Sequence, residues 1–369
     1  MKVFIAQSKN LNPKDAALEL KSNFSANNIK AITFFASSNY NSADLISALN
    51  ESFPNIQVFG CSTAGEIISG NICSNSIVAM AFTDEIIEDI RVEVVNNINS
   101  NLDLHPTFEA FASYFNTPFN RLDDSKHFGL IYMDGLSKLE ETILGILGDH
   151  TNVMFVGGSA GDDLKFAKTT IYANEKHYEN SAVLVIIKSK VGFGFEKIQS
   201  FSATPHKVVA TKVDEPNRII YELNGKPAVE VYANILNTTV ADAPNCFMRY
   251  ALGLMVDDQP YIRSIQQIVE DTALMLYCNV KEGTELQIME SGNIIGDTKK
   301  ELENFKKKYK SISGILIFNC ILRTLELQDK NIADEYANLF SDIPTVAFST
   351  YGEVYVGHVN QTATFLILE

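Results

Sequence analysis

The chain has 369 residues, of which 46% are hydrophobic and 20% are charged, close to the balance of an ordinary globular protein. Its net charge is −15, from 30 basic and 45 acidic residues. Because so acidic a surface repels phosphate backbones and anionic lipids, we expect neither nucleic acid nor a membrane as a partner. At roughly 100–200 residues per domain, the length predicts two domains.

Short apolar runs and unpaired cysteines predict a cytoplasmic location. The N-terminal run at residues 3–6 is too short for a signal peptide. The longest run, residues 182–187, falls far below the ~20 residues that span a bilayer. The five cysteines include no CxxC pair, which is typical of reduced thiols rather than of a metal ribbon.

A unit of strand, helix, strand, acidic turn and strand recurs three times along the chain. In the first copy, residues 34–35 lie in a strand and a helix begins at Ser42. A second strand covers 54–59, a turn covers 62–66, and a buried strand covers 77–82.

The second and third copies follow the same order with looser spacing. In the second, the strand at 128–133 precedes a helix from Ser137, where Glu140 three residues later predicts a capping box. Its turn covers 158–162 and its last strand 182–187. In the third, strand 315–318 precedes a helix whose apolar stripe begins at Ile332, the turn covers 349–353, and the last strand covers 362–368.

Residues 191–280 have a different pattern, with consecutive short strands and one helix over 227–236. A charged surface helix is expected over 299–310. We therefore predict an α/β fold, of the mixed α+β kind, with mixed sheets and a threefold repeated unit. The expected domains are 1–190, with two copies, and 191–369, with the strand-rich segment and the third copy.

The three turns combine hydroxyls, a glycine and an acid. Glycine permits close backbone approach, hydroxyls form local turn bonds, and consecutive N–H groups can hold an anion. The alternative is that each acid accepts hydrogen bonds from its own turn. The turn residues that we single out are Ser62, Thr63, Gly65, Glu66, Ser159, Gly161, Asp162 and Glu353.

Arginines and one further acid stand at the ends of apolar strands. Arg249, Arg263 and Arg323 present planar forks that match carboxylates, and Asp134 closes the strand at 128–133. Together with the acidic turns they predict a pocket with charges of both signs, suited to a zwitterion such as an amino acid. The alternative is a set of internal bridges between arginines and acids.

Signals for catalysis are weak. Residues 157–161 match G-x-S-x-G, but the helix that must follow a nucleophile elbow is missing after Ser159. Cys320 precedes Arg323, and a nearby arginine lowers a thiol pKa, yet a buried thiol is the simpler interpretation. No pair of the six histidines has the spacing of an HExxH site.

In combination, these motifs resemble the FIST-domain family, which has an N-terminal and a C-terminal segment. The resemblance covers nearly the whole chain in order. It is carried by residues 60–67, 134–137 with Glu140 and Glu141, 157–162, 222–228, 261–263, Cys320 with Arg323, 350–353 and 360–362.

The resemblance implies a prokaryotic, cytoplasmic sensory protein without enzymatic activity that binds a small ligand. Because no output domain is readable, the signal is expected to pass to a separate protein, such as a histidine kinase or a chemoreceptor. One alternative is a haem-binding nitric-oxide sensor that uses His206 or His358, although no cofactor is expected. The other is a hydrolase or transferase built on Ser159 or Cys320.

Overall fold

The computed structural model describes residues 2–25, 28–257 and 259–369, which divide into two compact units. The first unit comprises Met1–Lys197, Thr298–Gly357 and Ala363–Glu369, and the second comprises Ile198–Asp297 and His358–Thr362. This division differs from the expected boundary at residue 190. The reason is long-range strand pairing, since the C-terminal strands hydrogen-bond to strands from the first third of the chain.

The fold is mixed α/β, and the strands of the first unit lie in three six-stranded sheets, in which residues 198–199, 358–359 and 362 at strand ends belong to the second unit. The first sheet has the order β1 (Val3–Ser8), β6 (Ile77–Thr83), β2 (Ile29–Ser37), β3 (Gln57–Thr63), β10 (Ile171–Ala173) and β11 (Lys176–Tyr178). The second has β7 (Ile87–Asn96), β12 (Ser181–Ser189), β8 (His127–Met133), β9 (Phe155–Ser159), β24 (Glu353–Tyr355) and β25 (Gly357–Val359). The third has β13 (Phe193–Gln199), β26 (Thr362–Leu368), β22 (Gly314–Cys320), β23 (Thr345–Thr350), β4 (Glu66–Ile68) and β5 (Asn71–Cys73).

The same arrangement occurs in each of these sheets. A parallel pair lies at the centre (β2 with β3, β8 with β9, β22 with β23), and helices connect its two strands. A third strand, β6, β12 or β26, runs antiparallel to the first strand of the pair. Parallel strands covered on both faces are continuously apolar, which explains the buried runs in the sequence. That the three segments superpose as duplicated copies stays a prediction.

Each sheet is completed by a hairpin from another segment of the chain. The hairpin β4–β5, which follows β3, pairs with β23. The hairpin β10–β11, which follows β9, pairs with β3. Strand β24, which follows β23, pairs with β9. This cyclic exchange ties the C-terminal segment into the first unit.

The inner faces of the three sheets share one hydrophobic core. One aromatic ring from the first strand of each central pair lies in it: Phe35, Tyr132 and Phe318. Their ring centroids are 5.5 Å (Phe35–Tyr132), 6.3 Å (Phe35–Phe318) and 6.1 Å (Tyr132–Phe318) apart. Burial of such large rings stabilises the packing of the three sheets against one another.

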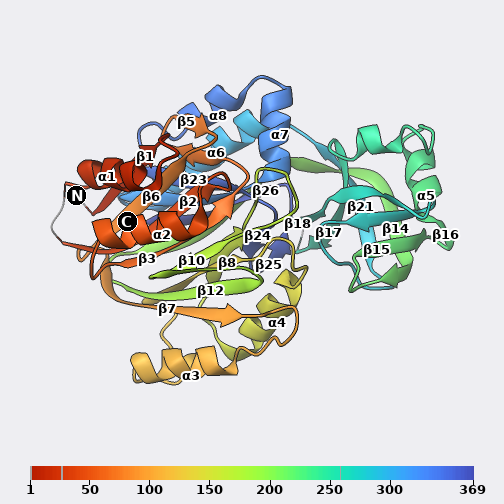
Figure 1. The fold of residues 1–369 in the computed structure, drawn as a ribbon. Helices are drawn as coiled ribbons and strands as arrows, with labels where there is room; N and C mark the ends of the chain where they lie inside the picture. Colours follow the sequence, from red (N-terminus) through yellow and green to blue (C-terminus); the bar gives the residue numbers. More distant parts are fainter. Residues whose placement is uncertain (1, 26–27, 258) are drawn as a thin grey trace. The chain divides into compact units, whose positions relative to one another are not determined.

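Helices cover the outer faces (Figure 1). Apolar residues of α1 (Pro13–Asn23) and α2 (Ser42–Ser52) pack on the first sheet, and those of α3 (His105–Tyr114) and α4 (Glu140–His150) on the second. Aromatic contacts to Phe365 of β26 place α6 (Ile294–Lys308) and the end of α8 (Ala333–Asn338) on the third. The remaining helix of this unit is α7 (Ile321–Asp329).

The second unit is built on one antiparallel sheet with its own hydrophobic core. Helix α5 (Ala228–Ile235) packs on this sheet, and it corresponds to the helix predicted over 227–236. The strands in order are β18 (Gln259–Arg263), β17 (Tyr250–Val256), β21 (Glu285–Ser291), β14 (Phe201–Asp214), β15 (Ile219–Leu223), β20 (Ala273–Leu276) and β19 (Ile265–Val269), and β16 (Lys226–Pro227) pairs with β15.

One local prediction is wrong, and one helix was not predicted. The capping box is not formed, because Lys138 adopts a positive φ of 58° and α4 begins only at Glu140, with no side-chain cap. The Ser137 hydroxyl instead donates to the carbonyl of Asp134 at 2.8 Å. Helix α7, directly after β22, was not predicted, since its residues follow the strand without any turn signal.

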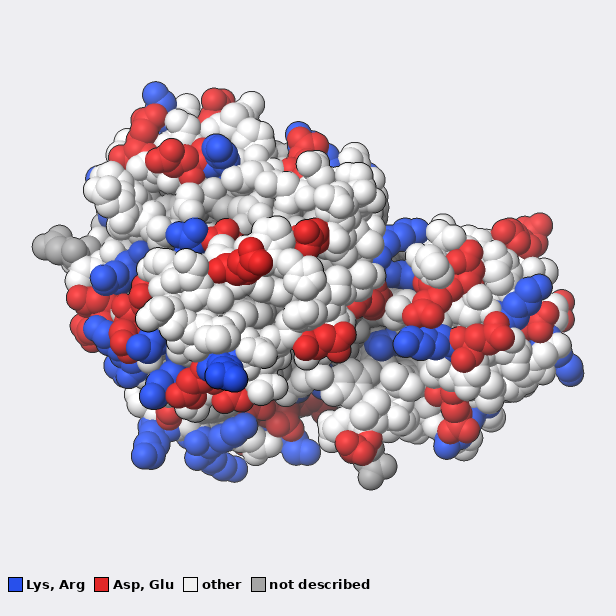
Figure 2. All heavy atoms as spheres, turned by 90° about the horizontal axis from the view of Figure 1, so that it is seen from below, with Lys and Arg blue, Asp and Glu red and all other residues white. Residues whose placement is uncertain are grey.

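Acidic and basic side chains are interspersed over the face drawn in Figure 2. Across the described part of the chain, no helix has both the length and the apolar character required to cross a bilayer.

Candidate functional site

The three predicted turns meet in the first unit and form a closed ring of backbone hydrogen bonds. In each turn, the N–H two residues after the serine donates to the serine carbonyl of another turn. The bonds are Ala64 to Ser349 at 3.1 Å, Gly161 to Ser62 at 2.9 Å, and Tyr351 to Ser159 at 3.2 Å. The turns therefore join the three segments through backbone hydrogen bonds.

Close approach explains the glycines of the turns. A Cβ on Gly161 would lie 2.7 Å from the backbone nitrogen of Ala64, closer than any side chain tolerates. Gly65 adopts a φ of 122°, which L-residues rarely adopt. Thus Gly65 and Gly161 are required for the ring itself.

The acid of the first turn is sealed from solvent. Glu66 accepts hydrogen bonds from the hydroxyls of Thr63 and Ser76, both at 2.5 Å. Burial raises the pKa of Glu66 to about 8, although these hydroxyls act in the opposite direction. Near neutral pH the carboxyl is therefore largely protonated, and its partners are a hydroxyl of its own turn, Thr63, and the hydroxyl of Ser76 beyond the turn.

The acid of the second turn organises a loop. Asp162 accepts the Tyr351 hydroxyl at 2.5 Å and the backbone N–H groups of Phe166, Ala167 and Lys168 at 2.9, 2.6 and 2.9 Å. Burial favours the neutral form, but these hydrogen bonds outweigh it and lower the pKa of Asp162. Asp162 is therefore ionised at neutral pH.

The loop that Asp162 holds, residues 162–168, has a strained backbone. Asp163, Leu164 and Phe166 adopt positive φ values of 55°, 64° and 50°, uncommon for such residues. The Tyr351 hydroxyl accepts the N–H of Leu164 at 3.0 Å, and its ring stacks on Phe166 at 4.8 Å. Strain of this kind persists only where surrounding contacts impose it, and it is concentrated at functional sites.

A cavity of about 420 Å³ lies beside this loop. Its walls are the loop, the end of β2 with the N-terminus of α2, and β11. The lining residues are Ser38, Tyr40, Asn41, Ser42, Ala43, Asp162, Lys165, Ala167, Lys168, Thr170 and His177.

The lining has charges of both signs and many hydroxyls. Lys165 donates to Ser38 Oγ and Asn39 Oδ1, both at 2.9 Å, and Lys168 forms an exposed ion pair with Glu179 at 2.6 Å. Asn41 caps α2 by accepting the N–H of Asp44, and the positive end of the helix macrodipole lies there. The cavity can therefore hold a small polar ligand with a carboxylate at the lysine side.

Three other predicted residues of the first unit lie in its interior. Asp134 accepts the hydroxyl of Thr169 and the N–H of Leu136, each at 2.8 Å, and the N–H of Asn180 at 2.7 Å. The Ser159 hydroxyl donates to Glu140 Oε1 at 2.8 Å, and residues 160–170 form a loop instead of the helix of a nucleophile elbow. Glu353 is fully buried at the start of β24.

The predicted arginines have three different environments. Arg249, in the second unit, is 65% exposed and forms a surface ion pair with Glu290 at 2.7 Å. Arg263, also in the second unit, donates to the carbonyls of Asn279 and His358 at 3.1 and 3.4 Å. Arg323 is buried in the first unit.

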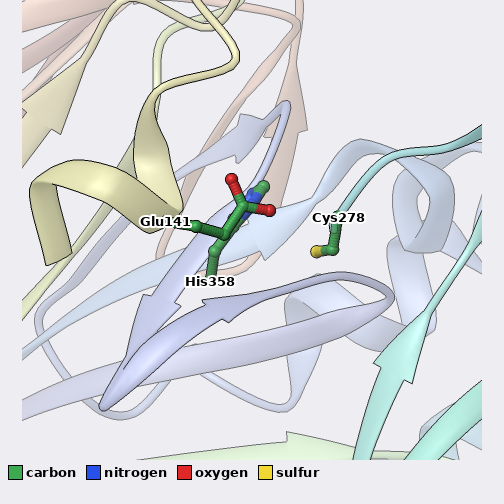
Figure 3. Close-up of side chains that lie close together, drawn as sticks. All are labelled: Glu141, Cys278 and His358. Atoms are coloured by element: carbon green, nitrogen blue, oxygen red, sulfur yellow. The ribbon is translucent and has the colours of Figure 1, made fainter. Parts of the chain in front are cut away.

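The remaining candidate side chains also have defined positions. His206 is exposed on β14, His358 is buried in the second unit, and Cys320 is buried at the end of β22. Figure 3 labels Cys278 and His358 of the second unit, together with Glu141 of the first. The thiol of Cys278 lies within 4.8 Å of an imidazole nitrogen of His358, and these two residues alone fall short of the four ligands of a structural zinc site.

Sequence reasoning missed most of the cavity. Among its lining residues only Asp162 was predicted. Two features of the sequence could have pointed to it. One is the helix-capping sequence Asn41–Ser42 before a predicted helix, and the other is the long connection that carries Lys165 and Lys168 between the second turn and the next strand.

The fold and the ring of turns define a mixed α/β protein of two units, with a polar cavity in the first. A FIST N domain matches residues 30–226 and a FIST C domain matches residues 228–356. The chain therefore belongs to the FIST family, whose domains are sensory domains of signal-transduction proteins. The boundary between the two matches falls inside the second compact unit.

A curated relative is the uncharacterized protein MJ1623 of Methanocaldococcus jannaschii. It is 23% identical over 287 residues, which cover 73% of this chain and 55% of the relative. The chain thus spans about half the length of this relative.

Proposed function

We propose that this protein is a cytoplasmic sensor that binds a small zwitterion, most simply a free amino acid, in the cavity beside the 162–168 loop. The observation that carries the proposal is the lining of the cavity, with Lys165, Lys168 and an ionised Asp162 around about 420 Å³. The lysines would face the carboxylate of the ligand. The ammonium group would lie toward Asp162 and the hydroxyl of Thr170, because Ser38 Oγ already accepts a hydrogen bond from Lys165.

The strained loop supplies a route from ligand to signal. Asp162 and Tyr351 hold the loop, and both belong to turns of the hydrogen-bonded ring. A ligand that contacts Lys165 and Lys168 would shift the equilibrium between the strained and a relaxed conformation of the 162–168 loop. We propose that a separate signalling protein, such as a histidine kinase or a chemoreceptor, reads this difference.

Exchanging the cavity lysines tests the proposal. With an amino acid at about 100 times its Kd, the melting temperature of the wild type should rise by several degrees. Lys165→Ala and Lys168→Ala should each reduce that rise, because they remove cations from the carboxylate end. Their melting temperatures without ligand should change little, since exposed ion pairs contribute at most about 1 kcal/mol.

Lys188→Ala is the matched control for Lys168→Ala. Lys188 also pairs with a glutamate, Glu88, at 2.6 Å, but it does not line the cavity. This variant should retain the full thermal shift. The screen covers amino acids and small organic acids. The proposed site is rejected if no compound raises the melting temperature of the wild type, or if Lys165→Ala and Lys168→Ala both retain the full rise.

A further inference from the structure

Cys278 and His358 lie close together in the interior of the second unit. Cys278 follows β20, and His358 belongs to β25. The thiol sulfur lies within 4.8 Å of an imidazole nitrogen, and the two residues are 0% and 3% exposed. Both belong to the second unit, whereas Glu141 in Figure 3 belongs to the first.

Hydrogen bonds within the second unit hold these two segments in place. Arg263 connects them, since Nε donates to the carbonyl of Asn279 at 3.1 Å and Nη1 donates to the carbonyl of His358 at 3.4 Å. Gln361 accepts the hydroxyl of Ser264 at 2.7 Å. The sulfur and the imidazole therefore have the supporting contacts that a binding site requires.

Asn360 is the third polar side chain at this place. It is 1% exposed, and its Oδ1 accepts the thiol of Cys278 at 2.7 Å. Among the described residues, no acceptor lies within hydrogen-bond distance of Asn360 Nδ2. A buried donor without an acceptor is destabilising, so its presence beside a thiol requires an explanation.

A thiolate at Cys278 would supply the missing acceptor. The amide of Asn360 could then be reversed, so that Nδ2 donates to the sulfur. A thiolate in so buried a place needs a positive charge beside it. A metal ion bound to both the sulfur and the imidazole nitrogen provides that charge. Typical bonds of about 2.3 Å to sulfur and about 2.0–2.1 Å to nitrogen bridge the separation, with side-chain shifts of a few tenths of an ångström at most.

We propose that Cys278 and His358 bind one Cu(I) ion in the second unit, with Asn360 as a positioning residue that donates to the thiolate. Thiolate and imidazole are donors that suit copper, and Cu(I) is satisfied by two ligands, whereas structural zinc takes four. One thiolate balances one monovalent ion, while Zn²⁺ would leave a net positive charge in the same buried place.

Binding replaces the S–H bond of Cys278 by an S–Cu bond and releases the proton to solvent. Copper stays Cu(I), so no electron is transferred. None of the three residues lines the cavity beside the 162–168 loop, and the site is therefore independent of the proposed function.

Competition with bicinchoninate, which forms a coloured Cu(I) complex, tests the site. The full chain is titrated into this complex without oxygen and with a phosphine reductant. The wild type should remove one equivalent of copper, and Cys278→Ser should remove none. Asn360→Ala should bind about 10–100-fold more weakly, the usual effect of losing a hydrogen-bond partner of a metal ligand. His358→Gln should lose more, because it removes a ligand.

Cys246→Ser is the matched control. Cys246 is the other thiol of the second unit and is less buried than Cys278, so this variant should retain the full copper binding. Lys165→Ala should also retain it, which separates this site from the cavity. Zn(II), titrated against a zinc indicator, should show no binding that depends on Cys278.

Three outcomes would overturn the inference. The site is absent if the wild type leaves the bicinchoninate complex intact, and it lies elsewhere if Cys278→Ser still removes one equivalent of copper. The choice of metal is wrong if Zn(II) binding depends on Cys278 and Cu(I) does not bind. Thermal unfolding without metal shows which variants are folded, and His358→Gln decides the assignment if Cys278→Ser is not.

Discussion

Replacing Asp162 with alanine is expected to lower the free energy of unfolding by about 3 kcal/mol and to abolish ligand binding in the cavity. The Asp162 carboxylate accepts the Tyr351 hydroxyl and three backbone N–H groups of the loop. Each buried donor left without an acceptor costs about 1–3 kcal/mol, and part of this is recovered where the released loop reaches water. The strained φ values of the loop should then relax, because nothing imposes them.

Urea unfolding at pH 7 and the thermal shift with ligand measure the two effects. Tyr351→Phe removes one donor to Asp162 and should cost less than Asp162→Ala. Because both variants act on one hydrogen-bond network, the double variant should lose less unfolding free energy than the sum of the two single losses. Asp124→Asn, at an exposed position, is the control and should leave both measurements unchanged. An Asp162→Ala protein of wild-type stability would show that the carboxylate does not hold the loop.

Glu66→Gln is expected to make the protein more stable at pH 8 while changing it little near pH 4.5. Burial raises the pKa of Glu66 from 4.5 to about 8. Between these values the unfolded chain releases the proton and the folded protein keeps it, so the stability of the wild type falls as pH rises. One pKa unit corresponds to about 1.4 kcal/mol, so this effect reaches about 3 kcal/mol at pH 7.

Glutamine stays neutral at every pH and can still face the hydroxyls of Thr63 and Ser76, which rotate freely. The difference in unfolding free energy between Glu66→Gln and the wild type should therefore grow from pH 5 to pH 8. Urea midpoints at four pH values measure it, with exposed Glu335→Gln as the matched control. A difference that is constant across this range would mean that Glu66 titrates as an ordinary carboxyl.

Most of the local structure of this protein could be predicted from its sequence. Short β-branched runs with flanking turn residues predicted the central strands, since a strand buried on both faces must be apolar throughout. The turns at 62–66, 158–162 and 349–353 were found because glycine and hydroxyl residues mark places where the backbone turns sharply. The match to the FIST models agrees with the family that these motifs resembled.

The pairing between distant segments was decided only by the tertiary structure. A hairpin such as β4–β5 presents the same hydrogen-bonding edge to any sheet. Its sequence therefore does not predict that it pairs with β23. This pairing places Thr298–Gly357 and Ala363–Glu369 in the first unit, so the division differs from the expected boundary at residue 190. It also formed the ring through which Asp162 meets Tyr351, 189 residues away.

The environments of charged residues depended on the same long-range contacts. Arg249 and Arg323 are both arginines beside predicted strands, yet one forms an exposed ion pair and the other is buried among neutral groups. Periodicity identifies which residues face a core, but the charge that surrounds a side chain is the sum over neighbours from many segments. For that reason the sequence named Asp162 and Arg323 as candidates, and only the folded chain showed that the Asp162 carboxylate holds a loop and that the Arg323 guanidinium is buried.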